Sequence, residues 1–189
     1  MKNEKTRKIA GVGILTAIVI VLQMMGSFIK LGPFSISLVL IPLVVGAALY
    51  GPYAGAFLGF IFGLVVLLSG DAAAFLAVTV FGTVLTVLVK GTLAGFVSGI
   101  VYKLFAKKPF LAAVMAAVSC PIVNTGVFLI GCFLFFMPTI STWAEALGFA
   151  NVYTYMILGL VGGNFIFELL SNAILSPIIV RIIDMGRNK

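Results

Sequence analysis

Six long apolar stretches run through this sequence, separated only by short turn-forming segments. A stretch of about 20 apolar residues can cross a bilayer core of about 30 Å as a helix. Charged residues make up 9% of the 189 residues, whereas they make up about 25% of a soluble domain. We therefore predict an all-α, polytopic membrane protein, with one compact bundle of six transmembrane helices as a single domain over residues 1–189. The expected helices lie at about 9–29, 36–50, 53–69, 75–102, 110–136 and 152–183.

Turn-forming residues mark the ends of these helices. The breaks fall at Gly32-Pro33, Gly51-Pro52, Ser69-Gly70-Asp71, Lys107-Lys108-Pro109 and the polar stretch 138–151. The second helix is short and contains Pro42, which favours a kink or a tilt. We expect the stretch 138–151 to be an outer loop that could close over a ligand, and Asp71 and Glu145 to be solvated loop residues.

The basic residues predict the orientation of the chain. Ten of the twelve Lys and Arg residues lie near the chain ends or between the fourth and fifth helices: Lys2, Lys5, Arg7, Lys8, Lys103, Lys107, Lys108, Arg181, Arg187 and Lys189. With six helices, all ten lie on one face, which the positive-inside rule makes cytoplasmic. We therefore expect a multi-pass protein of the cell membrane with both termini in the cytoplasm. Because these charges flank apolar spans and form no basic stripe with interleaved aromatic residues, they do not indicate nucleic-acid binding.

The residue types that the sequence lacks exclude several kinds of chemistry. It has no His and two Cys, so zinc, haem and copper sites and His-based triads lack their usual residues. It has no Gly-x-x-x-x-Gly-Lys-Ser/Thr run, so any ATP hydrolysis needs another chain. Cys120 and Cys132 are about 18 Å apart along one predicted helix, beyond disulfide reach, and we expect both to be buried. We predict no catalytic residues, no metal site and no cofactor.

Small residues at four-residue spacing predict close contacts between helices. They are Gly51, Gly55, Gly59 and Gly63 in the third helix, and Gly91, Gly95 and Gly99 in the fourth. Such stripes let helix backbones approach closely in a membrane, and we expect these two to pack inside the bundle. Gly13 and Ala17 repeat the spacing in the first helix, where a contact with another protein and a contact inside the bundle are both open.

Polar residues in the predicted spans indicate a binding pocket. Lys90 and Glu168 lie near the middle of their helices, where a charge costs at least about 2.5 kcal/mol. The candidate substrate-binding residues, which share faces of three helices, are Lys90, Asn124, Asn164, Glu168, Thr79, Thr83, Thr86, Phe128 and Trp143. A few convergent polar groups in apolar walls are typical of a small-ligand pocket. The alternatives are a structural ion pair between Lys90 and Glu168, and an interfacial anchor role for Trp143.

Two segments resemble the substrate-binding S components of energy-coupling factor (ECF) vitamin transporters. The first is the segment 36–59, which contains a Gly-Pro-x-x-Gly-x-x-x-Gly pattern beginning at Gly51. The second runs from Gly163 through Glu168 to Asn172 and Ser176-Pro177. The six-helix layout, the chain length and the small-residue face of the first helix are also similar. The resemblance therefore covers nearly the whole chain.

The resemblance implies a subunit without enzymatic activity that captures a water-soluble vitamin or precursor from outside the cell. It would deliver this ligand together with a transmembrane coupling protein and two ABC ATPases. In the family, the first helix contacts the coupling protein through an Ala-x-x-x-Ala pattern, so Gly13 and Ala17 would form the partner interface here. Family ligands are held by helices four to six and the outer loops, where the polar faces of this chain lie.

Pantothenate is the ligand that we expect within the family, with riboflavin and a pyrimidine precursor of thiamine as alternatives. One Lys with several Asn and Thr suits a small polar ligand that carries a carboxylate. A self-sufficient carrier that couples to ions through Lys90 and Glu168 is the alternative from another class, although the sequence shows no obvious inverted repeat. A membrane-embedded enzyme is disfavoured, because Asp71, Glu145 and Glu168 do not cluster by spacing.

Overall fold

The computed structural model describes residues 2–27, 30–31, 34–35 and 38–187. Its α-helices are α1 (Lys2–Gly26), α2 (Leu40–Tyr50), α3 (Pro52–Leu68), α4 (Ala73–Leu76), α5 (Val80–Leu104), α6 (Pro109–Gly131), α7 (Met137–Ala146), α8 (Val152–Thr154) and α9 (Gly163–Arg187). Two π-helical segments, η1 (Cys132–Phe136) and η2 (Tyr155–Gly162), continue α6 into α7 and α8 into α9. The predicted all-α class is confirmed, with one short antiparallel pair added, β1 (Lys30–Leu31) and β2 (Phe34–Ser35).

Four helical stretches are long and apolar enough to cross a membrane. They are Glu4–Gly26, Val80–Leu104, Pro109–Ala146 and Val152–Leu175. The helices α2 and α3 are apolar but have only 11 and 17 residues, which gives lengths of about 17 and 26 Å. Membrane character is therefore supported, while the count of six spans stays a prediction.

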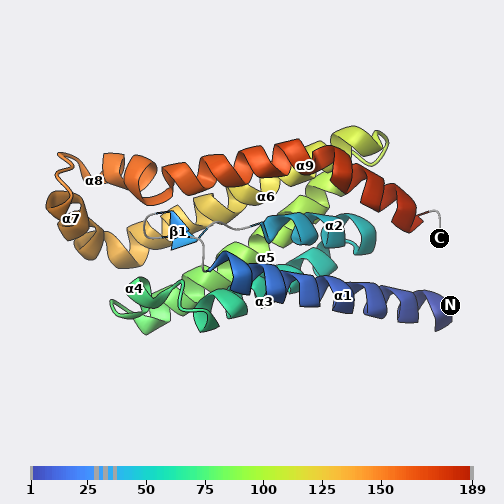
Figure 1. The fold of residues 1–189 in the computed structure, drawn as a ribbon, viewed down its shortest axis with the longest axis horizontal. Helices are drawn as coiled ribbons and strands as arrows, with labels where there is room; N and C mark the ends of the chain where they lie inside the picture. Colours follow the sequence, from blue (N-terminus) through green and yellow to red (C-terminus); the bar gives the residue numbers. More distant parts are fainter. Residues whose placement is uncertain (1, 28–29, 32–33, 36–37, 188–189) are drawn as a thin grey trace.

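The helices run along the long axis of the molecule (Figure 1). The start of α1, the turn between α5 and α6 and the end of α9 lie at one end, and α4, α7 and α8 lie at the other (Figure 1). The exposed side chains of Lys103, Lys107, Lys108 and Arg181 belong to the first end. Basic residues that are distant in the sequence are thus grouped at one end of the bundle, as the charge pattern predicts.

The two glycine stripes pack against each other and join α3 to α5. A Cβ atom built on Gly55 would collide with the carbonyl oxygen of Gly95, and one on Gly59 would collide with the carbonyl of Gly91. A Cβ atom on Gly63 would come within 2.9 Å of the Val87 carbonyl oxygen. Since only hydrogen fits between these backbones, the predicted contact inside the bundle is confirmed.

Two predicted elements are wrong, and local chemistry explains each difference. The helix expected at 75–102 is divided, because Thr79 has an extended backbone (φ −154°, ψ 120°) and caps α5 by accepting a hydrogen bond from the Gly82 amide. The loop expected at 138–151 is mostly helical, because Pro138 stands in the first turn of α7, where no backbone hydrogen bond is lost. Pro42 stands in the first turn of α2 for the same reason and causes no kink there.

The end of α7 shows where the chain does turn. Gly148 has a φ of +76°, and the Phe149 amide donates to the Ala144 carbonyl oxygen over 2.9 Å. This is the hydrogen bond of a glycine-terminated helix. The first predicted helix was expected to end near Ile29 and the second to start near Ile36, and these ends and the Gly32-Pro33 turn lie outside the described residues.

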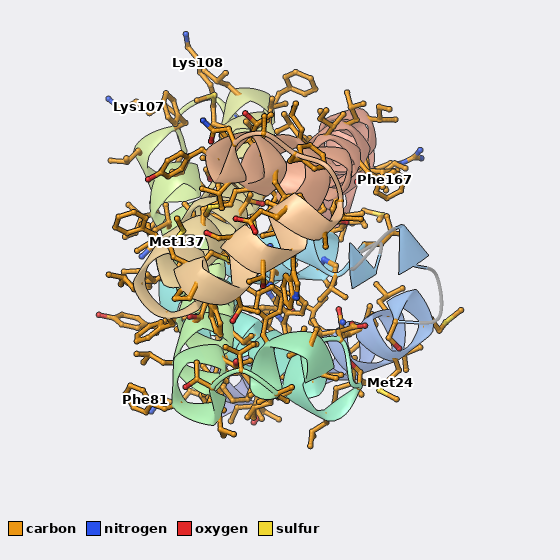
Figure 2. The ribbon with its side chains drawn as sticks, turned by 90° about the vertical axis from the view of Figure 1, so that its left-hand side faces the viewer. Met24, Phe81, Lys107, Lys108, Met137 and Phe167 are labelled. Atoms are coloured by element: carbon orange, nitrogen blue, oxygen red, sulfur yellow. The ribbon has the colours of Figure 1, made fainter. Side chains whose placement is uncertain are left out.

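The outer surface of the bundle is apolar. Met24, Phe81 and Phe167 point away from the helices (Figure 2), and they are 42%, 72% and 36% exposed. Further exposed apolar side chains occur on every long helix. A soluble monomer rarely exposes so much contiguous apolar surface, so this exterior fits a lipid environment.

Gly95→Ala tests the contact between α3 and α5. The added methyl group would strike backbone atoms of Gly55 and Ala56, so we expect a loss of about 1–3 kcal/mol in the free energy of unfolding. Thermal unfolding in detergent measures the change. The matched control is Gly126→Ala, which has nothing within 4 Å of its Cβ position and should be neutral or slightly stabilising. Equal stability of the two variants would contradict the tight contact.

Candidate functional site

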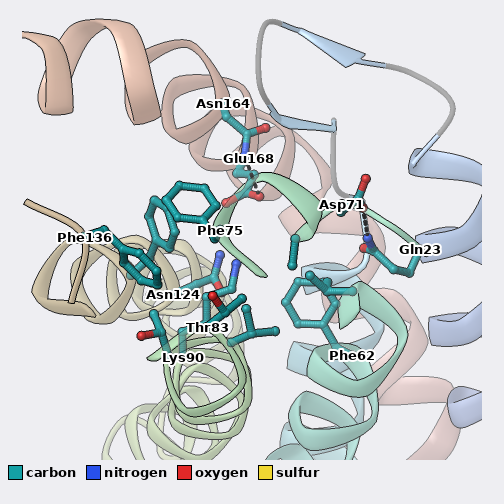
Figure 3. A pocket seen from close by; sticks show the side chains of 15 residues that line it. Gln23, Phe62, Asp71, Phe75, Thr83, Lys90, Asn124, Phe136, Asn164 and Glu168 are labelled. Carbon is teal, nitrogen blue, oxygen red and sulfur yellow. Dashed lines mark hydrogen bonds between the residues drawn. The ribbon is translucent and has the colours of Figure 1, made fainter. Parts of the chain in front are cut away.

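A cavity with about 610 Å³ of space, part of it open to solvent, lies among α1, α3, α5, α6 and α9. Its walls come from two buried clusters, one aliphatic and small-residue in character, the other aromatic. The polar residues that line it are Gln23, Asp71, Thr83, Thr86, Lys90, Asn124, Asn164 and Glu168, and the apolar ones are Phe62, Val66, Ala72, Phe75, Val87, Phe128 and Phe136 (Figure 3). A few polar groups that converge between apolar walls are typical of a small-molecule site.

Seven of the nine predicted site residues line this cavity: Thr83, Thr86, Lys90, Asn124, Phe128, Asn164 and Glu168. The structure sets the other two apart. Thr79 serves as the N-cap of α5, and Trp143 packs behind the wall with its ring centroid 5.6 Å from that of Phe75. The helix faces that the sequence predicted therefore converge on one cavity.

The Lys90 side chain lies between two aromatic rings. Its Nζ atom is 5.6 Å from the Phe62 ring centroid and 5.4 Å from the Phe128 ring centroid. The close contact of α3 with α5 brings Phe62 into position, since Phe62 packs beside Gly91. Rings at this distance stabilise a cation by about 0.5–2 kcal/mol.

Glu168 supplies the opposite charge from α9 and is 2% exposed. Its Oε1 atom accepts a hydrogen bond of 3.4 Å from Asn164 Nδ2 (Figure 3), whereas its Oε2 atom is buried without a hydrogen-bond partner among the described residues. The carboxylate and the Lys90 ammonium attract each other electrostatically. In the described part of the chain, however, the ammonium lies near the Phe62 and Phe128 rings and forms no direct ion pair with Glu168.

Several buried oxygen atoms of the wall accept no hydrogen bond from the part of the chain that the structure describes. Thr86 Oγ1, Asn124 Oδ1, Asn164 Oδ1 and Gln23 Oε1 have no hydrogen-bond partner among the described residues. An unsatisfied buried polar atom costs about 1–3 kcal/mol. The cavity therefore offers hydrogen-bond acceptors that an entering molecule with N–H or O–H groups can satisfy.

Aromatic rings form the wall nearest to α4 and η1. The Phe75 ring meets those of Phe128 and Phe136 edge to face, at centroid distances of 5.5 and 5.0 Å. Phe128 also borders a second, smaller cavity of about 310 Å³. Lys90, Asn124 and Asn164 line both cavities, so the two spaces meet around the same polar groups.

Two polar residues of the wall, Gln23 and Asp71, were not predicted from the sequence. Gln23 Nε2 donates a hydrogen bond of 2.6 Å to Asp71 Oδ2 (Figure 3). Asp71 was expected to be a solvated loop residue and is instead partly buried against the cavity. Gln23 carried a usable signal, since it is the one strongly polar residue in the apolar run of the first helix. No pattern in the sequence linked that run to the turn after α3.

The cysteines and acidic residues do not form a further chemical site. Cys120 and Cys132 are free and buried, as predicted. Among the described residues, His, Cys, Asp and Glu form no group of three that could hold a metal ion. The chemistry of the cavity therefore consists of hydrogen bonding, charge and aromatic contact.

Comparisons with known proteins identify relatives of the whole chain. A family model described as "ECF transporter, substrate-specific component" matches residues 7–183. The pantothenic acid transporter PanT of Lactococcus lactis subsp. cremoris (strain MG1363) is 26% identical in an alignment over 205 residues. The alignment covers 100% of this chain and 99% of that protein. A solved structure of ThiT from Listeria monocytogenes has a TM-score of 0.69 at 20% identity and covers 97% of this chain and 98% of its own. This last likeness shows a shared fold.

Replacement of the two buried charged residues, Lys90 and Glu168, by neutral residues tests whether the charges stabilise the fold. We expect Lys90→Met and Glu168→Gln each to lower the unfolding temperature in detergent by several degrees, because each leaves the other charge uncompensated. The double variant should unfold at or above the wild-type temperature, because replacing both buried charges is often neutral or stabilising. Lys103→Met and Glu145→Gln, which change exposed charges, are the controls. A double variant less stable than both single variants would show that the charges maintain the fold.

Proposed function

Since the chain belongs to the family of ECF transporter substrate-specific components, we propose that it binds pantothenate from outside the cell as the S component of an ECF-type importer. It is a transport component and not an enzyme. The observation that carries the proposal is the placement of Lys90 in a cavity otherwise rich in buried acceptors and aromatic rings. Its similarity over its full length to a pantothenic acid transporter supports the choice of ligand.

The chemistry of pantothenate matches the cavity group by group. Its carboxylate would meet the Lys90 ammonium, and this charge-assisted contact is stronger than a neutral hydrogen bond. Its secondary hydroxyl and its amide N–H would donate to free acceptors among Thr86, Asn124 and Asn164. Its two methyl groups would pack against Phe75 and the neighbouring rings. Thr83 and Glu168 complete the polar wall, and Glu168 would keep the Asn164 amide oriented.

We further propose six membrane spans with both termini in the cytoplasm. The charge pattern supports this orientation, because the basic residues gather at the end that holds the start of α1 and the end of α9. The cavity is bordered by Asp71, Phe75 and Phe136, which belong to the opposite half. It would therefore open toward the outside of the cell.

The exposed face of α1 is our proposed docking surface for the transmembrane coupling protein, which would bring two ABC ATPases. Only 11% of the residues in the apolar window of this helix are buried. Gly13 and Ala17 are exposed, and nothing lies within 4 Å of a Cβ atom on Gly13. A small-residue face without an intramolecular partner suits close packing against another helix in the bilayer.

Native mass spectrometry of the purified protein and a thermal-shift panel of water-soluble vitamins test the ligand. We expect bound pantothenate, with at least about tenfold weaker binding to Lys90→Met, because a charged hydrogen bond contributes about 1.5–3 kcal/mol. Panthenol, which has an alcohol in place of the carboxylate, should bind wild type weakly and should not distinguish it from Lys90→Met. Lys103→Met is the control. Selective binding of a different vitamin would replace pantothenate in this assignment.

Gly13→Leu and Ala17→Leu test the docking surface. Both should abolish uptake of labelled pantothenate in liposomes that contain the coupling protein and the ATPases, and both should leave binding to the isolated protein unchanged. Leucine protrudes from the small face and separates the two helices. The control is Ile9→Leu, an exposed position one turn away. Uptake by the isolated protein under a proton or sodium gradient would instead favour the self-sufficient carrier.

A further inference from the structure

Gln23 lines the cavity and belongs to α1, the helix that we propose as the docking surface. It is the single glutamine of the sequence, and it lies near the end of α1, a helix that is otherwise largely exposed. Its own side chain is 2% exposed and lines the cavity. A buried primary amide in an apolar helix needs hydrogen-bond partners, because its desolvation is otherwise costly.

Asp71 determines which way the Gln23 amide faces. A carboxylate only accepts hydrogen bonds, so the amide must present its NH₂ group to Asp71. The Nε2–Oδ2 distance of 2.6 Å corresponds to this arrangement. One N–H of the amide is engaged in this way, and Oε1 is buried without a hydrogen-bond partner among the described residues. Gln23 lines the cavity, and its amide therefore offers an oxygen acceptor there. The oxygen and nitrogen atoms of this amide cannot exchange places, because Asp71 accepts only from the NH₂ group.

We propose that Gln23 is a specificity-determining residue that accepts a hydrogen bond from a hydroxyl group of the ligand, with Asp71 as its positioning residue. The identity of the ligand rests on the proposed function, whereas the orientation of the amide does not. Lys90, on α5, offers a cation, and Gln23, on α1, offers an acceptor. The cavity thus selects a molecule with an anionic group and a separate hydroxyl donor. For pantothenate, the carboxylate meets Lys90 and the terminal hydroxyl meets Gln23.

The single glutamine permits a direct measurement. Protein synthesised with glutamine labelled at the side-chain carbonyl carbon gives one ¹³C signal from Gln23. We expect saturating pantothenate to shift this signal in the direction of a newly accepted hydrogen bond. Pantothenate with its terminal hydroxyl replaced by hydrogen should leave the signal close to that of the free protein. An unshifted signal with bound pantothenate, or equal shifts with both compounds, would overturn the proposal.

Affinities of the same two compounds supply a second test. Wild type should bind pantothenate at least about tenfold more tightly than the deoxy compound, because a site built around a hydroxyl group leaves its acceptor unpaired without it. Gln23→Met should reduce this ratio to about one. Asp71→Asn, which lets the amide turn over, should reduce the ratio to less than about threefold. Glu145→Gln, an exposed change in α7, should keep the wild-type ratio, and a wild-type ratio in Gln23→Met or Asp71→Asn would overturn the proposal.

A ligand-free measurement separates the two proposals. If wild type binds no pantothenate in native mass spectrometry, the proposed function fails. The orientation of the Gln23 amide can still be measured, because the following experiment needs no ligand. Labelling of the side-chain nitrogen gives one NH₂ pair, which should exchange slowly with solvent in wild type and rapidly in Asp71→Leu. Equal exchange in both proteins would overturn the assignment of Asp71 as the positioning residue.

Discussion

The backbone contact between α3 and α5 determines where the other parts of the molecule can lie. Gly55, Gly59 and Gly63 bring α3 against the carbonyl groups of α5, so that the Phe62 ring reaches the Lys90 ammonium one turn away. Without that approach, the lysine would lose one of its two aromatic neighbours and the cavity would lose a wall. Packing in the membrane depends on such small residues, because lipid tails leave no hydrophobic drive to bring helices together.

Burial of charge in the bundle is the second organising constraint. Lys90 and Glu168 face one cavity from different helices, and neighbouring groups moderate the cost of their burial: two aromatic rings near the cation and the Asn164 amide beside the carboxylate. Neither charge is used up by a direct ion pair among the described residues. Both are therefore free to contact a polar molecule that enters, as the proposed binding role requires.

The sequence predicted those parts of the site that obey helical periodicity. Thr83, Thr86 and Lys90 share a face of α5, and regular spacing alone placed them together. Prediction failed where a single residue changes the local rule: Thr79 begins a helix that was expected to be continuous, and Pro138 begins one where a loop was expected. Gln23 and Asp71 were missed for a different reason. Their hydrogen bond spans 48 positions along the chain, and no local pattern encodes such a pairing.

The two halves of the bundle are held together by different kinds of contact. The glycine contact consists of backbone atoms, which have no rotamers to change, whereas the Phe75, Phe128 and Phe136 rings of the other cluster meet at their edges and can turn about their side-chain torsions. Adjustment of the cavity to a differently shaped molecule therefore falls on the aromatic half. Exchange of a few rings could retune selectivity over evolutionary time, while the glycine framework stays as it is.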